Sequence, residues 1–243
     1  MSDTISLSEE ARIIKELEEY DTATVTNVVA TYPGAPTCLS LYSPWECNWY
    51  TDQSMRVMFP EMGRTCGFAV TCIYGLPDAT EKTGLGIKDI LCAIEETPKP
   101  VVLVIKQKFP EAIKGKVGLC GGNMTTAFKS MGCIGIVSDG PSRDLEEVRN
   151  LGVQYMLTGT TAGHGPIEAK AVNVPVSVCG MDVCPGEIIH MDINGAVKFP
   201  RKYLKDVLEK CKLLTEEENR KMKLMASTND PEKIADYMKG IYR

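Results

Sequence analysis

Residues 118–147 decide the fold, and they read GLCGGNMTTAFKSMGCIGIVSDGPSRDLEE. The glycine-rich turn near their start leads into apolar residues at the spacing of one helix face: Met124, Ala127, Phe128 and Met131. Gly132 ends this helix, and the apolar run 134–137 predicts a strand. Residues 139–142 then form a turn, and residues 144–151 a second helix. The stretch therefore predicts a strand between two helices, each opened by a turn.

Short apolar runs alternate with helical patterns on both sides of this stretch. Upstream, the runs 68–74, 101–105 and 117–119 predict strands, with a helix near 86–96. Downstream, residues 154–157 predict a further strand. This alternation is typical of α/β folds, which bind ligands outside the carboxyl ends of their strands.

The end of the sheet is expected to be antiparallel. Asn194-Gly195 separates the apolar segments 188–191 and 196–199, and an Asn-Gly pair in that place is a strong hairpin signal. The fold class is therefore predicted to be α/β with a mixed central sheet.

After Pro200 the sequence becomes rich in Lys and Glu and predicts helices near 201–213, 216–226 and 231–239. The second of these would be capped by Thr215 and Glu218, three residues apart. We predict one α/β catalytic domain over residues 1–200, with an N-terminal helix, and a helical C-terminal extension over 201–243.

At the N-terminus, Ser6 and Glu9 form a capping box that predicts a helix over 7–19. Residues 33–65 are rich in proline and glycine and show no sustained period, so a long loop is expected. Trp45 and Trp49 lie in it, either as a lid over a site or, preferably, as aromatic side chains that fix the loop to the core.

Composition excludes several classes of protein. Lys+Arg number 27 and Asp+Glu 32, for a net charge of -5, so the basic excess of a nucleic-acid-binding protein is missing. The longest aliphatic run, 101–105, is far too short for a membrane span, and the acidic start lacks the pattern of a signal peptide. We expect a cytoplasmic protein that binds neither nucleic acid nor membrane.

The 10 cysteines include no C-x-x-C pair. Zinc ribbons need such pairs, and a cytosolic chain of this length needs no disulfides, so most of these thiols are expected to be buried apolar groups.

Each of the two turns could hold an anionic ligand. In the first, Gly121 and Gly122 permit close backbone approach at a helix start, although the pattern matches neither nucleotide-binding fingerprint. In the second, Arg143 can grip a planar carboxylate, Asp144 can bind a hard divalent cation, and Glu147 lies on the same helix face. The alternative is structural, because Asp144 and Glu147 have the spacing of a capping box.

The chain resembles the RraA-like family in the spacing of a short motif. The motif consists of Gly122, twenty intervening residues, Arg143-Asp144, two further residues and Glu147. That family contains divalent-metal-dependent pyruvate aldolases acting on 4-hydroxy-4-methyl-2-oxoglutarate and related acids, and also protein regulators of ribonuclease E. The resemblance covers roughly residues 20–200, and its segments are 24–29, 67–71, 121–124, 135–144, 173–176 and 185–189.

The resemblance implies a role for each residue of the two turns. Arg143 would bind the pyruvyl carboxylate, Asp144 would ligate Mg²⁺ or Mn²⁺ directly, and Glu147 would hold the metal through water. Substrate oxygens would be bound at the first turn, by Gly121, Gly122, Asn123 and Met124. Arg143 and Asp144 would be the catalytic residues of a carbon–carbon lyase that releases pyruvate from a small 2-oxo acid, by retro-aldol cleavage or by decarboxylation of oxaloacetate.

The family fold is a layered α/β sandwich, and its members form homotrimers or homohexamers with sites at subunit clefts. An acidic residue of a neighbouring copy would then complete the metal shell, with Glu187 and Asp192 as candidates. The alternative function on this scaffold is a non-catalytic, protein-binding regulator of a ribonuclease.

The chain also departs from the family pattern. Relatives commonly carry an acidic residue at the place of Gly122, although the glycine form fits the aldolases, and residues 158–165 lack an arginine often found before the glycine. His164, in that glycine-rich segment, is a candidate general acid or additional ligand, whereas His190 lies in an apolar strand and is a weaker candidate.

Overall fold

The computed structural model describes residues 6–80 and 82–242. Its helices are α1 (Leu7–Leu17), α2 (Thr22–Val29), α3 (Ile87–Glu96), α4 (Glu111–Lys114), α5 (Gly122–Ser130), α6 (Leu145–Leu151), α7 (Leu204–Ala226) and α8 (Pro231–Met238), with 3-10 turns at Pro60–Met62 and Arg201–Tyr203. Its strands are β1 (Arg56–Val57), β2 (Thr65–Gly75), β3 (Val101–Lys108), β4 (Cys133–Ser138), β5 (Gln154–Leu157), β6 (Glu168–Val172), β7 (Val176–Val178), β8 (Met181–Val183), β9 (Ile188–Asp192) and β10 (Gly195–Phe199).

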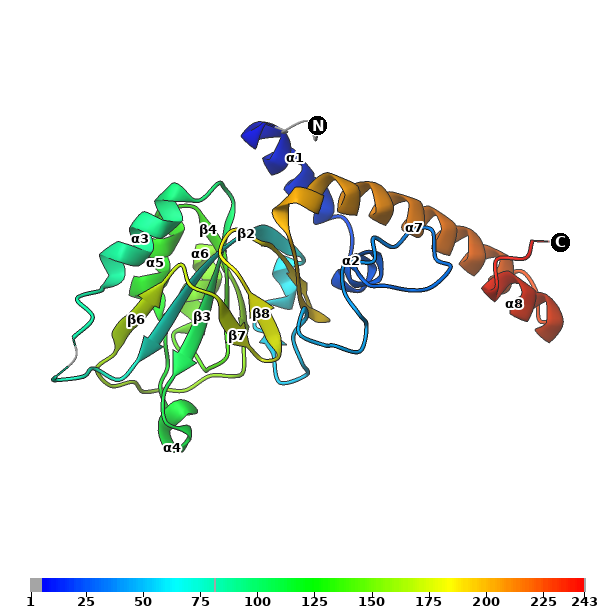
Figure 1. Cartoon of the computed structure of the whole chain (residues 1–243). Coiled ribbons are helices and arrows are strands. Elements are labelled where there is room, and N and C mark those ends of the chain that lie inside the picture. The colour runs from blue at the N-terminus through cyan, green and yellow to red at the C-terminus, as the bar shows by residue number, and fades with distance from the viewer. Residues whose placement is uncertain (1–5, 81, 243) are drawn as a thin grey trace.

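A mixed sheet forms the centre of the molecule, with strand order β1-β5-β4-β3-β2-β9-β10 (Figure 1). Strands β2 to β5 are parallel, and β1 and β9 pair antiparallel at the two ends of this group. The long strand β2 pairs with β9 along its first half and with β6 along its second half. The predicted α/β class with a mixed sheet is confirmed, and so is the β9–β10 hairpin.

Alternate side chains of the parallel strands enter two different cores. Leu103 faces the layer of α3, α5 and α6, where it packs in a cluster with Phe128 and Val148. Its neighbours Val102 and Val104 face the other side, where the β7–β8 hairpin supplies Val178 and Met181. Figure 1 shows the hairpin and these helices on opposite faces of the sheet. Both faces are therefore covered, as the unbroken apolar runs of β3 and β4 require.

Leu103 is fully buried, and replacing it with alanine is expected to lower the free energy of unfolding by about 2–5 kcal/mol, because a cavity remains. Leu7, at the start of α1 and 60% exposed, is the matched control, and its alanine variant should change stability by less than about 0.5 kcal/mol. Urea unfolding of both variants measures the difference. Equal losses would contradict this account of the core.

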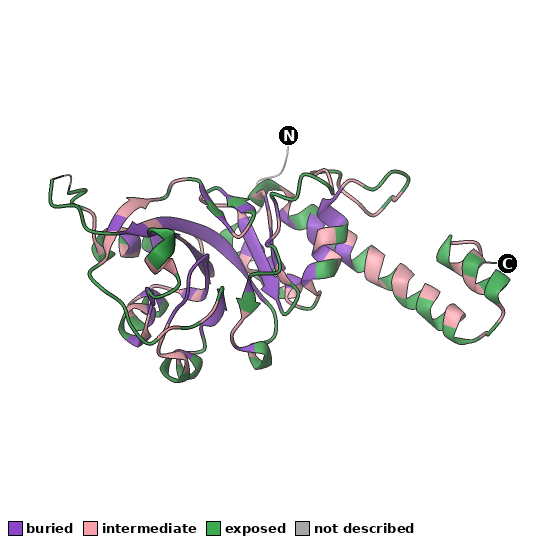
Figure 2. Ribbon diagram, turned by 90° about the horizontal axis from the view of Figure 1, so that it is seen from below, coloured by how far each residue is buried: buried purple, intermediate pink, exposed green. Residues whose placement is uncertain are grey.

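A third cluster joins the N- and C-terminal helices to the edge of the sheet. Leu17 of α1 and Val28 of α2 pack there against Leu208 of α7. The first half of α7 is thus partly buried, whereas its second half and α8 project away from the body as an arm (Figures 1 and 2). Within the described residues, no helix is both long and apolar enough to cross a membrane.

Three local predictions are wrong. Residues 117–119 form no strand but an extended connection from α4 to α5. The predicted helices 201–213 and 216–226 are a 3-10 turn followed by one continuous helix, α7, so the box of Thr215 and Glu218 lies inside a helix and caps nothing. No glycine or proline interrupts residues 201–226, and the helical pattern continues through the box.

Trp45 and Trp49 do not act as a pair. Trp49 is 1% exposed, stacks on Tyr42 with ring centroids 5.2 Å apart, and donates from its indole nitrogen to the carbonyl of Ser43 at 3.0 Å. Trp45 is 90% exposed. The preferred interpretation therefore holds for Trp49 alone, because only its indole packs in the core.

The ten cysteines are all free thiols, and five of them are buried: Cys66, Cys72, Cys120, Cys133 and Cys211. Cys47, Cys92 and Cys184 are exposed. The prediction that most of them are buried is thus correct for half of the set.

Candidate functional site

The two predicted turns lie against each other at one end of the sheet. The backbone N–H of Gly122 donates to Oδ2 of Asp144 at 3.1 Å, and the N–H of Leu119 donates to the carbonyl of Pro141 at 3.1 Å. The hydroxyl of Ser142 donates to the carbonyl of Cys120 at 3.1 Å. Side chains from both turns therefore face one shared region.

Asp144 has an unusual backbone conformation. Its φ of 58° and ψ of 36° are left-handed, and its side chain makes no capping hydrogen bond to α6. The capping-box alternative is thus wrong, because the carboxylate turns toward Gly122 and away from the helix it precedes. A non-glycine residue in this conformation costs on the order of 1–3 kcal/mol, and such strain is concentrated at functional sites.

Arg143 is held beside Asp144 by a single hydrogen bond, which leaves its other guanidinium nitrogens available. Its Nε donates to Oδ1 of Asp144 at 3.1 Å, and the two side chains are 34% and 29% exposed. Within the described part of the chain, no acceptor is bound to the two terminal nitrogens of the guanidinium. Those nitrogens can therefore form the paired hydrogen bonds that a planar carboxylate accepts.

The two glycines make room for two carboxylates. A Cβ added at Gly121 would collide with the Asp144 carboxylate, and one added at Gly122 would collide with Oε2 of Glu147. Residues 121 and 122 therefore need to be glycine for Asp144 and Glu147 to lie over the turn. This contact also gives a physical reason for glycine at position 122, where relatives commonly carry an acidic residue. In this chain the acidic group near that position is the Glu147 carboxylate.

A cavity of about 230 Å³ opens between the turns. Among the predicted residues, it is lined by Gly121, Asn123, Met124, Arg143 and Asp144. Gly118, Cys120, His164 and Ile167 also line it, whereas Gly122 and Glu147 do not. The structure thus brings five of the seven predicted site residues together around one small space, with Arg143 and Asp144 on its wall.

The donor set suits a hydrated divalent cation. Asp144 offers the second lone pair of each oxygen, and Glu147 lies on the same side of the turn. In the described residues, no three His, Cys, Asp or Glu side chains gather as a metal site. Mg²⁺ is commonly bound through one or two carboxylates while it keeps several waters, so these residues fit Mg²⁺ or Mn²⁺ with water or a substrate completing the shell.

A buried ionic group that sequence reasoning missed supports the second turn. Asp139 accepts hydrogen bonds from the Lys106 ammonium at 2.6 Å and the Lys114 ammonium at 3.0 Å, and from the N–H of Gln107 at 2.7 Å. Its side chain is only 3% exposed. Losing one partner of a buried charge is costly, so Asp139 fixes the position from which the turn to Arg143 starts. No sequence signal links these residues, because their spacing is set by the sheet.

Glu187 and Asp192 are engaged within their own fold. Glu187 pairs with Lys198 at 2.9 Å and accepts from the N–H of Cys184 at 2.8 Å. Asp192 is buried and accepts from the N–H of Thr22 at 2.8 Å. The role proposed for them in a neighbouring copy stays a prediction.

His190 is a core residue. It is fully buried, with Nδ1 3.0 Å from the Thr22 hydroxyl and Nε2 3.1 Å from the carbonyl of Leu17. Burial lowers the pKa of His190 to about 4. The side chain is therefore neutral in the folded protein, which agrees with its low rank as a site candidate.

His190 should make stability depend on pH. Its folded pKa lies below the ordinary 6.5, so between these values the unfolded chain binds more protons, and stability falls as the pH falls from about 6.5 to about 4. The loss from this group is on the order of 3 kcal/mol. Urea unfolding across this range should show a smaller pH dependence for His190→Gln than for the wild type. Parallel curves would contradict the shift.

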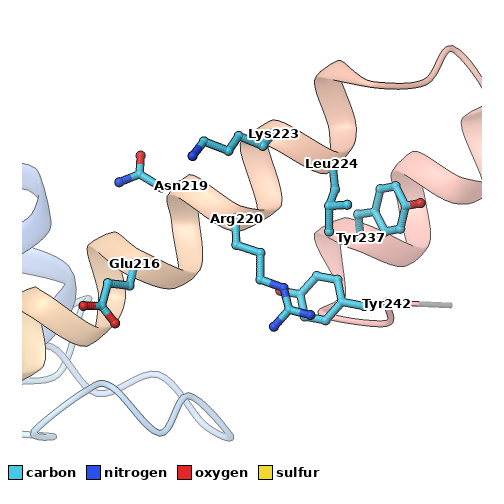
Figure 3. A pocket seen from close by; sticks show the side chains of 7 residues that line it. All are labelled: Glu216, Asn219, Arg220, Lys223, Leu224, Tyr237 and Tyr242. Carbon is cyan, nitrogen blue, oxygen red and sulfur yellow. The ribbon is translucent and has the colours of Figure 1, made fainter.

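A larger cavity, of about 630 Å³, lies on the arm between α7 and α8. Figure 3 shows Arg220 against Tyr242, with the guanidinium carbon 4.3 Å from the ring centroid, and Tyr237 beside them. It shares no residue with the cavity at the two turns. Its size alone does not make it the candidate site, because the described residues that line it include no group of metal-ligating side chains.

Comparison with known proteins agrees with these features. A family model described as RraA-like, Aldolase/RraA, matches residues 46–198. An uncharacterized protein of Methanocaldococcus jannaschii is 32% identical over 108 residues, which are 44% of this chain and 52% of that protein. A Thermus thermophilus protein named 4-hydroxy-4-methyl-2-oxoglutarate aldolase is 31% identical over 86 residues, which are 35% of this chain and 52% of the relative. The chain thus spans about half the length of these curated relatives.

A solved structure shares the fold over most of the chain. Streptomyces coelicolor RraAS2, described as an unusual member of the RNase ES inhibitor RraA protein family, aligns with a TM-score of 0.64 at 22% identity, covering 87% of this chain and 95% of the other. The family match includes both turns of the site and more than half of the residues. The resemblance seen in the sequence is therefore confirmed, and this chain belongs to the RraA-like family, which includes proteins named as aldolases and as an RNase inhibitor.

Proposed function

We propose that this protein is a divalent-metal-dependent lyase that cleaves a carbon–carbon bond of a small 2-oxo acid and releases pyruvate. The observation that carries the proposal is the pairing of Arg143 and Asp144 on the wall of one cavity, with the guanidinium fork free and the carboxylate turned away from its helix. A surface that only binds another protein does not need this arrangement. The aldolase name of the Thermus thermophilus relative supports the same reaction class.

The chemistry divides between the two turns. Arg143 would hold the C1 carboxylate of the substrate, and the backbone of Asn123 and Met124, at the start of α5, would orient the neighbouring oxygens. Asp144 would hold Mg²⁺ or Mn²⁺, with Glu147 ordering its waters. When bound, the metal would stabilise the negative charge that develops on the 2-oxo oxygen as the bond breaks. Retro-aldol cleavage and oxaloacetate decarboxylation both place charge there, so one site would serve both reactions.

The test is pyruvate release by the purified 243-residue chain from oxaloacetate and from 4-hydroxy-4-methyl-2-oxoglutarate. Each reaction is run with Mg²⁺, with Mn²⁺ and with EDTA, and the metal-only rate is subtracted because oxaloacetate decarboxylates spontaneously. We expect metal-dependent turnover that EDTA removes. If neither substrate is turned over above the metal-only rate, the lyase proposal fails and the protein-binding regulator becomes the better hypothesis.

The arm supports a proposal about assembly. Leu213 and Met222 on α7 and Met238 on α8 are 52%, 54% and 68% exposed. Large exposed apolar patches mark interaction surfaces, and we propose that another copy of the chain covers these three side chains together. We expect a homotrimer or homohexamer, measured by light scattering after gel filtration, and a monomer at micromolar concentration would exclude it.

A further inference from the structure

The segment after β5 is fixed against both turns of the candidate site. The N–H of Gly118, before the first turn, donates to the carbonyl of Gly163 at 2.9 Å. Ser142, in the second turn, donates its N–H to Gly159 at 3.2 Å and accepts from the N–H of Thr161 at 2.9 Å. Residues 159–163 are thus held against both turns, including the turn that carries Arg143.

This anchoring brings His164 to the cavity. His164 follows Gly163 directly and lines the same space as Arg143 and Asp144. Its Nδ1 lies 3.0 Å from the carbonyl of Gly165. A carbonyl oxygen only accepts hydrogen bonds, so Nδ1 carries the proton and, in the neutral ring, Nε2 has the free lone pair. In the described part of the chain, no group is hydrogen-bonded to Nε2.

Other side chains of the cavity are poorly suited to removing a proton. Burial raises the pKa of the Cys120 thiol well above its ordinary value, so Cys120 stays protonated. Asn123 and Met124 are not bases, and in the proposed function the Asp144 carboxylate would be occupied by the metal. Among the lining residues, His164 has a basic nitrogen without a partner.

We propose that His164 is the catalytic base that removes the proton of the 4-hydroxyl group when this site cleaves a 4-hydroxy-2-oxo acid, an inference that rests on the proposed function. Nε2 takes the hydroxyl proton and the C4 oxygen becomes a carbonyl as the C3–C4 bond breaks. The electron pair of that bond forms the enolate of pyruvate. The imidazolium then returns the proton to C3, so the products are pyruvate and a carbonyl compound, and no oxidant or reductant is consumed.

Decarboxylation of oxaloacetate does not need this base. The departing carboxylate is already ionised, so the C3–C4 bond breaks without removal of a proton, and water can protonate the enolate. Comparing the two reactions therefore distinguishes a catalytic base from a residue that only maintains the shape of the loop. A structural role for His164 would affect both reactions alike.

The experiment compares the two substrates in the wild type, His164→Ala, His164→Gln and the loop control Ala162→Ser, each saturated with Mg²⁺. Ala162 is exposed and does not line the cavity. We expect both His164 variants to lose about 100-fold or more in kcat/KM for 4-hydroxy-4-methyl-2-oxoglutarate, and less than about threefold for oxaloacetate. Added imidazole should partly restore retro-aldol cleavage by His164→Ala, and Ala162→Ser should match the wild type in both reactions.

Equal losses in the two reactions, or no loss in retro-aldol cleavage, would overturn the role of His164 and leave the proposed function intact. A wild-type protein that decarboxylates oxaloacetate but does not cleave the hydroxy acid would also overturn it. A wild-type protein active on neither substrate would instead overturn the proposed function, and this role with it.

Discussion

Replacing Asp144 with asparagine is expected to lower metal-dependent pyruvate release by about 1,000-fold, the factor that corresponds to about 4 kcal/mol of lost transition-state stabilisation. The variant keeps the shape of the side chain and an oxygen that can accept the hydrogen bond from the N–H of Gly122. It removes the negative charge that would hold the cation. The loss should therefore appear in activity and in metal affinity, with little change in the fold.

Glu146 provides the matched control, because it is an exposed acid of the same helix that does not line the cavity. Glu146→Gln removes one negative charge close to Asp144 and should retain the wild-type rate. Isothermal titration with Mn²⁺ should show weaker binding to Asp144→Asn only. If Asp144→Asn keeps both the wild-type rate and the wild-type affinity, Asp144 is not the metal ligand.

Local sequence signals predicted much of the fold correctly. The strand predicted at 154–157 matches β5, and Asn194-Gly195 marks the β9–β10 hairpin. Both depend on short-range chemistry, namely apolar runs and a turn that glycine permits. The strand predicted at 117–119 is wrong, although the run is apolar. Its N–H groups donate to the carbonyls of Pro141 and Gly163 instead of to a neighbouring strand, and such long-range contacts cannot be read from sequence spacing.

At the site, too, local residue types could be predicted from the sequence, whereas contacts between distant segments could not. The residue types of Arg143, Asp144 and Glu147 were enough to select them, but not to decide between a metal site and a helix cap. The left-handed backbone of Asp144 excludes the helix cap, because the carboxylate turns away from α6, and the metal site stays a prediction. His164 was a candidate from its glycine-rich segment, but the backbone contacts of residues 159–163 that hold this segment against both turns cannot be read from sequence spacing.

Gly121 offers a test that removes no charged group from the site. Its φ of -66° is one that alanine adopts readily, so Gly121→Ala should cost the fold less than about 1 kcal/mol. The added Cβ would nevertheless occupy the place of the Asp144 carboxylate and approach Cγ of Arg143 at 3.3 Å. Both side chains would have to shift, and misplacement by about 1 Å can cost about 100-fold in rate.

Two further glycines complete the comparison. Gly122→Ala should reduce the rate only about three- to tenfold, because the atom that its Cβ meets is the far end of the exposed Glu147 side chain, which can move aside and would act only through water. Gly115→Ala, with φ of -70° and open space around it, should match the wild type. In assays of pyruvate release, Gly121→Ala should lose the most activity, Gly122→Ala less and Gly115→Ala almost none. Thermal unfolding should show nearly equal stability for the three variants. If Gly121→Ala is as active as Gly115→Ala, the reaction does not depend on the carboxylate above the first turn, because that carboxylate must shift when the methyl group is added.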